Sequence, residues 1–141
     1  MQLINHQAEE SLISCIFKDT SLLKTTTLQP KHFHDVSNKL IFNTLVDLDS
    51  RNEPIDTVTI ITAIKPENLN KIGGTQKLTL LENATPNLEN FKTYEDYIFE
   101  AWKIREAKRL KESEINSLSD IHSLQEKLSE LETETNDDEY N

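Results

Sequence analysis

The sequence is poor in cysteine and glycine, which limits the kinds of site it can build. Among 141 residues it has one cysteine and two glycines. The single thiol, Cys15, excludes an intrachain disulfide and a thiolate zinc site. We expect Cys15 to be a small buried apolar side chain, because a lone cysteine behaves as one in most folded chains.

Both glycines stand together, as Gly73 and Gly74. Two readings are open for such a pair: a phosphate-binding loop, or a tight turn that needs left-handed backbone. The segment has no GxxxxGK[ST] pattern and no strand before it, so we favour a turn into a helix capped by Thr75.

Long apolar runs are also missing. No stretch reaches the roughly 18 apolar residues of a membrane span, and residues 1–6 lack the basic start and apolar centre of a signal peptide. We therefore expect neither membrane insertion nor secretion, and a cytoplasmic location. A length of 141 residues with 35% apolar side chains fits one small domain with a modest core.

Positive charge is scarce, since the formal net charge is −10. An acidic balance opposes binding to a polyanion, so we expect no direct contact with nucleic acid. The one basic cluster lies between residues 103 and 111. Because it alternates with glutamates, we interpret it as a solvated helix face. Its members are Lys103, Arg105, Lys108, Arg109 and Lys111.

Arrangements typical of catalysis are absent from the sequence. His32 and His34 are two residues apart, which places them on different faces of any helix, and no H-x-x-x-H pair or G-x-S-x-G elbow occurs. We predict no catalytic, metal or cofactor site and no enzyme activity. The chain is interpreted as a binding or assembly module.

What the sequence does contain is helical periodicity. Ile41, Leu45 and Leu48 recur at i, i+4 and i+7, with Phe42 and Val46 widening the stripe, which predicts a core helix. Its cap should be Asp35 or Ser37, and it should end before Pro54, which disfavours helical backbone in the preceding residue.

The next segment, 57–64, sets propensity against pattern. Its run of β-branched residues favours a strand. The cap offered by Asp56, the i, i+3, i+6 spacing of Val58, Ile61 and Ile64, and the stop at Pro66 favour a helix, and so does the lack of a partner strand. We predict a helix.

Shorter signals divide the rest of the N-terminal part. A helix is predicted over residues 6–17 with Asn5 as its cap, a short helix follows a cap at Thr20 or Ser21, and a single turn begins at Pro30. A further helix should end before Pro86. The apolar residues expected to face the core in these elements are Ala8, Leu12, Cys15, Ile16, Phe33, Leu78, Leu80 and Leu81.

The C-terminal part predicts a helical hairpin. Residues 87–113 form the longest helical stretch, and after a break near Asn116 a last helix, capped by Ser119 or Asp120, carries apolar residues at i, i+3, i+7 and i+10. Such a seam packs against a neighbouring helix or a partner chain. The seam residues are Ile121, Leu124, Leu128 and Leu131.

These patterns predict an all-α chain: a compact multi-helix head at 1–92, a helical hairpin at 93–131, and an acidic, disordered tail or linker at 132–141. Tyr97 and Trp102 are candidate interface anchors together with the seam, although both could instead pack the head against the hairpin.

Several segments in order resemble one known family, the N-terminal domain of the bacterial replicative DNA helicase, DnaB. The resemblance is nearly free of gaps through residue 110 and is specific in its combination of E-P-I-D-x-V-T, I-G-G and T-P-N-x-x-N-F-x-x-Y. It rests on residues 6–17, 28–33, 34–39, 40–48, 53–59, 72–74 and 85–94.

The resemblance implies a head of about six helices followed by a hairpin, which joins neighbouring subunits into the collar of a helicase ring. It implies a homo-oligomer with helicase subunits, of its own kind or of a host, and primase or a helicase loader as partners. The phosphate loop of the motor domain is absent from the sequence, and the segment between Leu110 and Ile121 is about ten residues shorter than the family pattern. An alternative is a stand-alone adaptor resembling the helicase-binding domain of primase.

Overall fold

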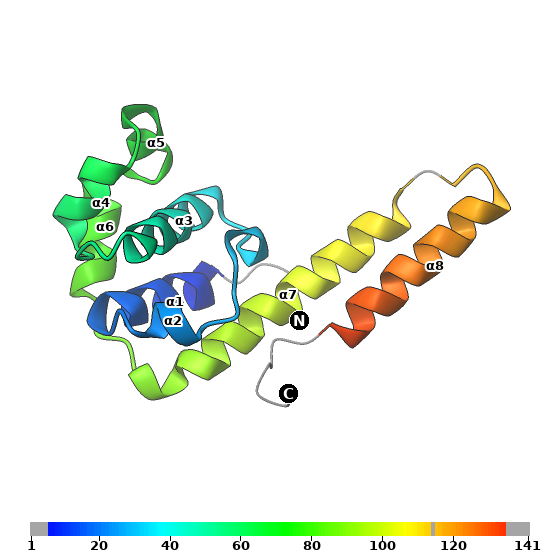
Figure 1. Ribbon diagram of the computed structural model, residues 1–141, viewed down its shortest axis with the longest axis horizontal. Helices are drawn as coiled ribbons and strands as arrows, with labels where there is room; N and C mark the ends of the chain where they lie inside the picture. Colours follow the sequence, from blue (N-terminus) through cyan, green and yellow to red (C-terminus); the bar gives the residue numbers. More distant parts are fainter. Residues whose placement is uncertain (1–5, 114, 135–141) are drawn as a thin grey trace.

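The computed structural model describes residues 6–113 and 115–134, and all regular structure in those ranges is helical (Figure 1). The longer helices are α1 (His6–Lys18), α3 (Val36–Ser50), α6 (Gly74–Asn83), α7 (Phe91–Lys111) and α8 (Leu118–Thr133). The shorter ones are α2 (Leu22–Thr25), α4 (Thr57–Ala63) and α5 (Pro66–Lys71), with single 3-10 turns at Pro30–His32 and Leu88–Asn90.

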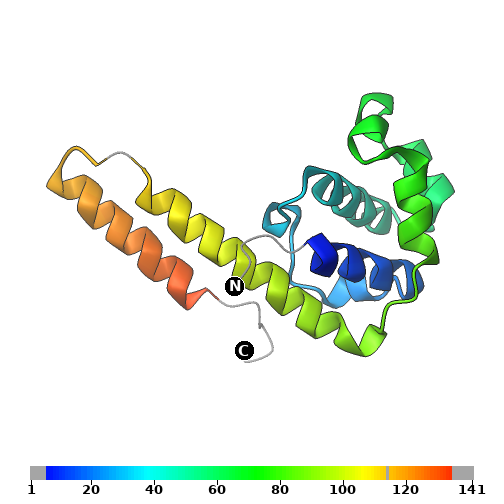
Figure 2. The ribbon, with the colours of Figure 1, turned by 180° about the vertical axis from the view of Figure 1, so that it is seen from behind.

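Helices α1 to α6 form a head, and α7 runs along its base and then projects away to pair with α8 (Figures 1 and 2). This arrangement confirms the predicted all-α fold of head and hairpin. The division at residue 92 stays a prediction, because α7 packs against α1 at one end and against α8 at the other. Helix α8 continues to Thr133, two residues past its predicted end, while residues 135–141 of the acidic tail lie outside the described ranges.

The head core forms where helix periodicity predicts it. Leu12 and Ile16 of α1 and Ile41, Leu45 and Leu48 of α3 are fully buried, as Cys15 is. The rings of Phe33 and Phe42 stack with centroids 4.5 Å apart. Val46 was predicted to widen the α3 face but is 40% exposed, because it lines an open groove together with Ala63 and Ile64.

Segment 57–64 forms a helix despite its β-branched residues. Asp56 accepts a hydrogen bond from the Thr59 amide at 2.8 Å, and the Thr59 hydroxyl accepts one from the Asp56 amide at 3.0 Å, so a complete capping box starts α4. The predicted face was wrong in part. Ile60 and Ile64 are buried whereas Val58 is 71% exposed, because α3 and α6 pack on the Ile60 side.

One predicted helix cap was wrong, and the predicted stop at Pro66 also begins the next helix. Pro66 does not only stop α4; it occupies the first turn of α5, where its missing amide proton costs nothing. Gly73, with φ of 97°, is the N-cap of α6, so the turn was predicted correctly but Thr75 is not its cap. Asn5, the predicted cap of α1, lies outside the described residues.

Further differences concern single positions. The N-cap of α8 is Ser117, two residues before the nearer predicted cap, and its hydroxyl accepts from the Asp120 amide. Leu80 is 71% exposed while Leu78 and Leu81 are buried, because α6 presents only one face to α1 and α4. Of the two caps proposed for α3, Asp35 is the one observed.

Several helix ends are stabilised by side chains from other helices. The buried Glu9 carboxylate accepts from the His34 and Asp35 amides at the start of α3, at 2.7 and 3.3 Å, and Glu82 accepts from the Thr57 amide at the start of α4. Lys18 donates to the Glu82 carbonyl near the end of α6. Acids at N-termini and bases at C-termini match the helix dipoles, so these contacts fix how the helices meet.

Candidate protein interface on the hairpin and head

Helix α7 connects the head to the hairpin because nothing in its 21 residues interrupts it: the segment holds neither proline nor glycine. Its first half buries Phe91, Ile98 and Phe99 against the head. Its second half packs against α8. A rigid helix shared in this way fixes the direction in which the hairpin projects.

The two aromatic candidates on α7 lie in different environments. Trp102 is buried, with its ring 4.7 Å from the His32 ring and 5.7 Å from that of Phe99, and the Lys31 ammonium lies over it at 5.2 Å. Tyr97 is 51% exposed. Tyr97 is therefore available to a partner, whereas Trp102 joins the head to α7.

His32 is the polar member of this aromatic cluster. Its Nδ1 accepts a hydrogen bond from the Gln29 amide at 2.9 Å, which requires a ring without a proton at that nitrogen. Burial, and then the nearby Lys31 charge, lower the pKa of His32 to about 4. Sequence reasoning excluded His32 as a metal ligand but did not identify its place in the core.

The predicted α8 seam packs against α7 along part of its length. Leu131 is buried, Leu124 and Leu128 are half-buried against the core, and Ile121 is 39% exposed. Contact with α7 therefore improves from the tip of the hairpin toward the end of α8. The seam was predicted to pack against the long helix before it, and the structure confirms that α8 packs against α7.

The tip of the hairpin is apolar and exposed. Leu118 is 83% exposed, Ile115 is 43% exposed, and Ile121 follows Leu118 by three residues on the same face of α8. Sequence reasoning missed Ile115 and Leu118 because they lie in the predicted break, where no periodicity marks a face. The signal present was their apolar character inside an otherwise polar turn.

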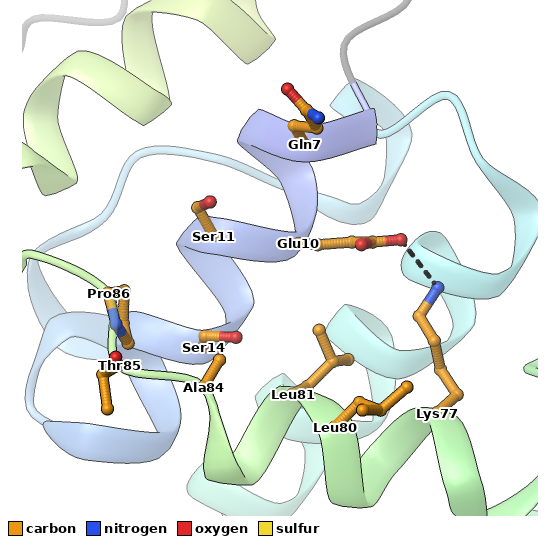
Figure 3. Close-up of a pocket in the computed structure, with 10 residues that line it drawn as sticks. All are labelled: Gln7, Glu10, Ser11, Ser14, Lys77, Leu80, Leu81, Ala84, Thr85 and Pro86. Carbon is orange, nitrogen blue, oxygen red and sulfur yellow. Dashed lines mark hydrogen bonds and ion pairs between the residues drawn. The ribbon is translucent and has the colours of Figure 1, made fainter.

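The head carries a groove of about 480 Å³ between α1 and α6 (Figure 3). Leu80, Leu81 and Pro86 form its apolar side, and an ion pair between Lys77 and Glu10, 3.1 Å long, lies at one end. Polar side chains of α1 complete the lining: Gln7, Ser11 and Ser14.

The basic cluster of α7 is only partly the solvated face that was predicted. Lys108, Arg109 and Lys111 are exposed, and Arg109 pairs with Glu106 at 2.6 Å. Arg105 differs, because its guanidinium turns inward and donates to the His32 carbonyl at 3.2 Å. Arg105 thus contributes to the packing of α7 on the head, while Lys108, Arg109 and Lys111 lie on the surface.

Other kinds of site find no support in the described ranges. No three His, Cys, Asp or Glu side chains among those residues gather closely enough to hold a metal ion. No described helix combines the length and apolar character that a membrane span requires. The exposed apolar tip, Tyr97 and the α1–α6 groove are the surfaces that we consider for protein binding.

Two known proteins with related sequences are replicative DNA helicases. Replicative DNA helicase DnaC of Bacillus subtilis (strain 168) is 31% identical over 93 residues, which is 64% of this chain and 20% of that protein. Replicative DNA helicase DnaB of Geobacillus stearothermophilus is 30% identical over 91 residues, with 62% and 20% covered. The chain thus spans about a fifth of the length of these relatives.

Solved structures share the fold. The N-terminal domain of DnaB helicase from Mycobacterium tuberculosis superposes with a TM-score of 0.77 at 20% identity, covering 92% of this chain and 99% of that one. A structure described as a DnaB-like replicative helicase and its interactions with primase gives 0.79 at 23% identity, with 95% and 33% covered.

A family model decides the assignment, because it covers more than half of the sequence. Residues 1–100 match the model described as "DnaB-like helicase N terminal domain". The match includes α1 to α6 and the first half of α7, the part in which Glu9, Asp56 and Gly73 shape the helix ends. The chain belongs to the family of DnaB-like helicase N-terminal domains.

Proposed function

We propose that this chain acts as a helicase collar domain, a non-catalytic module that self-associates and docks primase or a helicase loader in DNA replication. The observation that carries the proposal is the exposed apolar tip of the hairpin, formed by Ile115, Leu118 and Ile121. An exposed apolar group at the end of a projecting element is typical of a protein contact surface.

Charge and chemistry favour protein partners over other ligands. The net charge of −10 opposes binding to DNA, and the sequence has no phosphate-binding loop. Family membership supports helicase subunits as partners, and one similar structure is described with its interactions with primase. The head groove between α1 and α6 is a second surface for docking, separate from the tip.

Self-association is tested by light scattering over a concentration series from about 1 to 500 µM, because association follows mass action. We expect the mean mass to rise with concentration. Leu118→Asp should shift the midpoint at least about tenfold upward, since it places a charge in the contact. Val58→Asp is the matched control, because Val58 is similarly exposed but lies on α4 in the head.

The outcome separates the collar from an adaptor. A strict monomer throughout the series would contradict the collar proposal and favour the adaptor that binds a helicase without associating with itself. Equal effects of Leu118→Asp and Val58→Asp would show that the tip is not the contact. Both residues are exposed, so neither change should lower the melting temperature by more than a few degrees.

A further inference from the structure

The end of α8 is held by a side chain of α7. The Lys103 ammonium donates to the carbonyl oxygens of Glu134, at 2.9 Å, and of Glu132, at 3.4 Å. These carbonyls lie at the C-terminus of α8, where no further helical amide can reach them. A cation there also opposes the partial negative charge of the helix end.

Apolar packing alone attaches α8 weakly. Leu131 is the one buried residue of α8, all of which the structure describes, and the other seam residues are half-buried or exposed. Lys103 and Leu131 both act at the same end of the helix and line one groove between α7 and α8. The stem of Lys103 is fixed in turn, because its ammonium lies over the Phe99 ring at 5.8 Å.

We propose that Lys103 is a latch: it fastens the C-terminal end of α8 to the middle of α7 and so fixes where the chain leaves the hairpin. Figures 1 and 2 both show α8 ending beside the middle of α7. Without the latch the last turns of α8 lose their stabilising cation and open more often, while the tip and the head keep their own contacts. The latch is a conformational device separate from the binding surfaces of the proposed function.

Amide hydrogen exchange followed by NMR on the whole chain tests the latch. Lys103→Met keeps the apolar stem and removes the donor. Lys108→Met is the matched control, since Lys108 is an exposed lysine one turn and a half further along α7. In Lys103→Met we expect the amides of residues 128–134 to exchange about three- to tenfold faster, the size of losing one exposed charged hydrogen bond. Amides of α1, α3 and the first half of α7 should keep their rates.

Three results would overturn the latch. Unchanged exchange at 128–134 in Lys103→Met, or the same change in Lys108→Met, would show that the ammonium does not hold the helix end. Faster exchange throughout the molecule would show that Lys103 supports the whole fold instead. Lys103→Arg, which keeps a charged donor, should restore slow exchange at 128–134 in part.

Discussion

At the scale of single residues, buried ionisable groups decide how stability depends on pH. His32 lies in an aromatic cluster, and its pKa is lowered to about 4 chiefly by burial. Glu95 is also buried, and burial raises the pKa of its carboxyl despite hydrogen bonds from Thr26 and the Thr27 backbone. The folded state thus disfavours the charged form of both groups. The two groups therefore change the stability in opposite directions as pH rises.

For each group, the direction in which stability changes with pH depends on whether the folded or the unfolded chain binds more protons. Between pH 4 and 6.5 the unfolded chain binds more protons at His32 than the folded chain does, so His32 makes stability rise with pH in that window. Above pH 4.5 the folded chain holds its Glu95 proton longer than the unfolded chain does, so Glu95 makes stability fall as pH rises. The two effects oppose each other, and a variant is needed to separate them.

His32→Asn should weaken the loss of stability on acidification. Its amide oxygen can accept from the Gln29 amide in place of Nδ1, but it cannot take up a proton. Urea unfolding at pH 7.5, 6 and 5 measures the difference between wild type and variant, in which the Glu95 contribution cancels. We expect this difference to shrink by about 1–2 kcal/mol between pH 7.5 and 5.

The control for that experiment is His122→Asn, because His122 is exposed on α8 and its contact with Glu126 lies on the surface, where an ion pair contributes little to stability. It should leave the pH dependence close to that of wild type. A difference between wild type and His32→Asn that stays constant with pH would contradict the role assigned to His32.

At the scale of the elements, helix ends matter more than helix propensity. Helix α4 has seven residues, most of them β-branched, and it begins with two acids from different places in the chain. Asp56 accepts from the Thr59 amide and Glu82 from the Thr57 amide. Two of the amides that a short helix cannot satisfy by itself are therefore paired, and its N-terminus is stabilised.

Asp56→Ala should cost about 1 kcal/mol of unfolding free energy, the usual effect of losing an N-cap. Chemical denaturation measures this loss, and amide exchange should show the opening concentrated in α4. Thr62→Ala is the control on the same helix, since Thr62 is exposed and bonds only within α4. An Asp56→Ala protein as stable as Thr62→Ala would show that Glu82 alone suffices.

The sequence predicted elements well where local signals decide them and less well where the neighbours do. The Asp56 cap and the Gly73 turn are local and were identified. Val58 and Leu80 were placed on buried faces, but which side of a short helix is covered depends on where α3 and α1 lie. Glu9 was missed because its partners are backbone amides about 25 residues away, which no pattern reveals.

In the candidate site, too, some residues were predicted from local patterns and others were not. The hairpin and its seam were predicted from helical periodicity. Burial of the seam residues increases along α8 and is greatest at Leu131. The exposed tip residue Leu118 lies in a turn and has no periodicity to mark it. Tyr97 and Trp102 share one helix, and packing against the 3-10 turn Pro30–His32 separates the buried ring of Trp102 from the exposed ring of Tyr97.

At the scale of the whole molecule, α7 is the element through which head and hairpin act together. Its aromatic residues Phe99 and Trp102 contact His32 from the head, and its far half carries α8. A change in this cluster therefore alters the position of the hairpin as well as the stability of the head. Binding defects at Trp102 and at Tyr97 have to be distinguished for that reason.

Tyr97→Ala should reduce binding to the helicase or primase proposed as partner while leaving the thermal melt within a few degrees of wild type, because Tyr97 is 51% exposed. Trp102→Ala should lower the unfolding free energy by about 3–5 kcal/mol, since it empties a buried site between two rings. Small domains have only about 5–15 kcal/mol in total, so a binding defect in Trp102→Ala would reflect unfolding. Calorimetric titration beside a circular-dichroism melt measures both quantities.

The pair of variants separates a contact residue from a structural one. Lost binding with an unchanged melt in Tyr97→Ala places the partner on the exposed face of α7. Unchanged binding in that variant moves the partner to the α1–α6 groove, where Leu80→Asp provides the next substitution because Leu80 is 71% exposed and lines the groove. An intact melt with lost binding in Trp102→Ala would contradict the burial argument and make Trp102 the anchor.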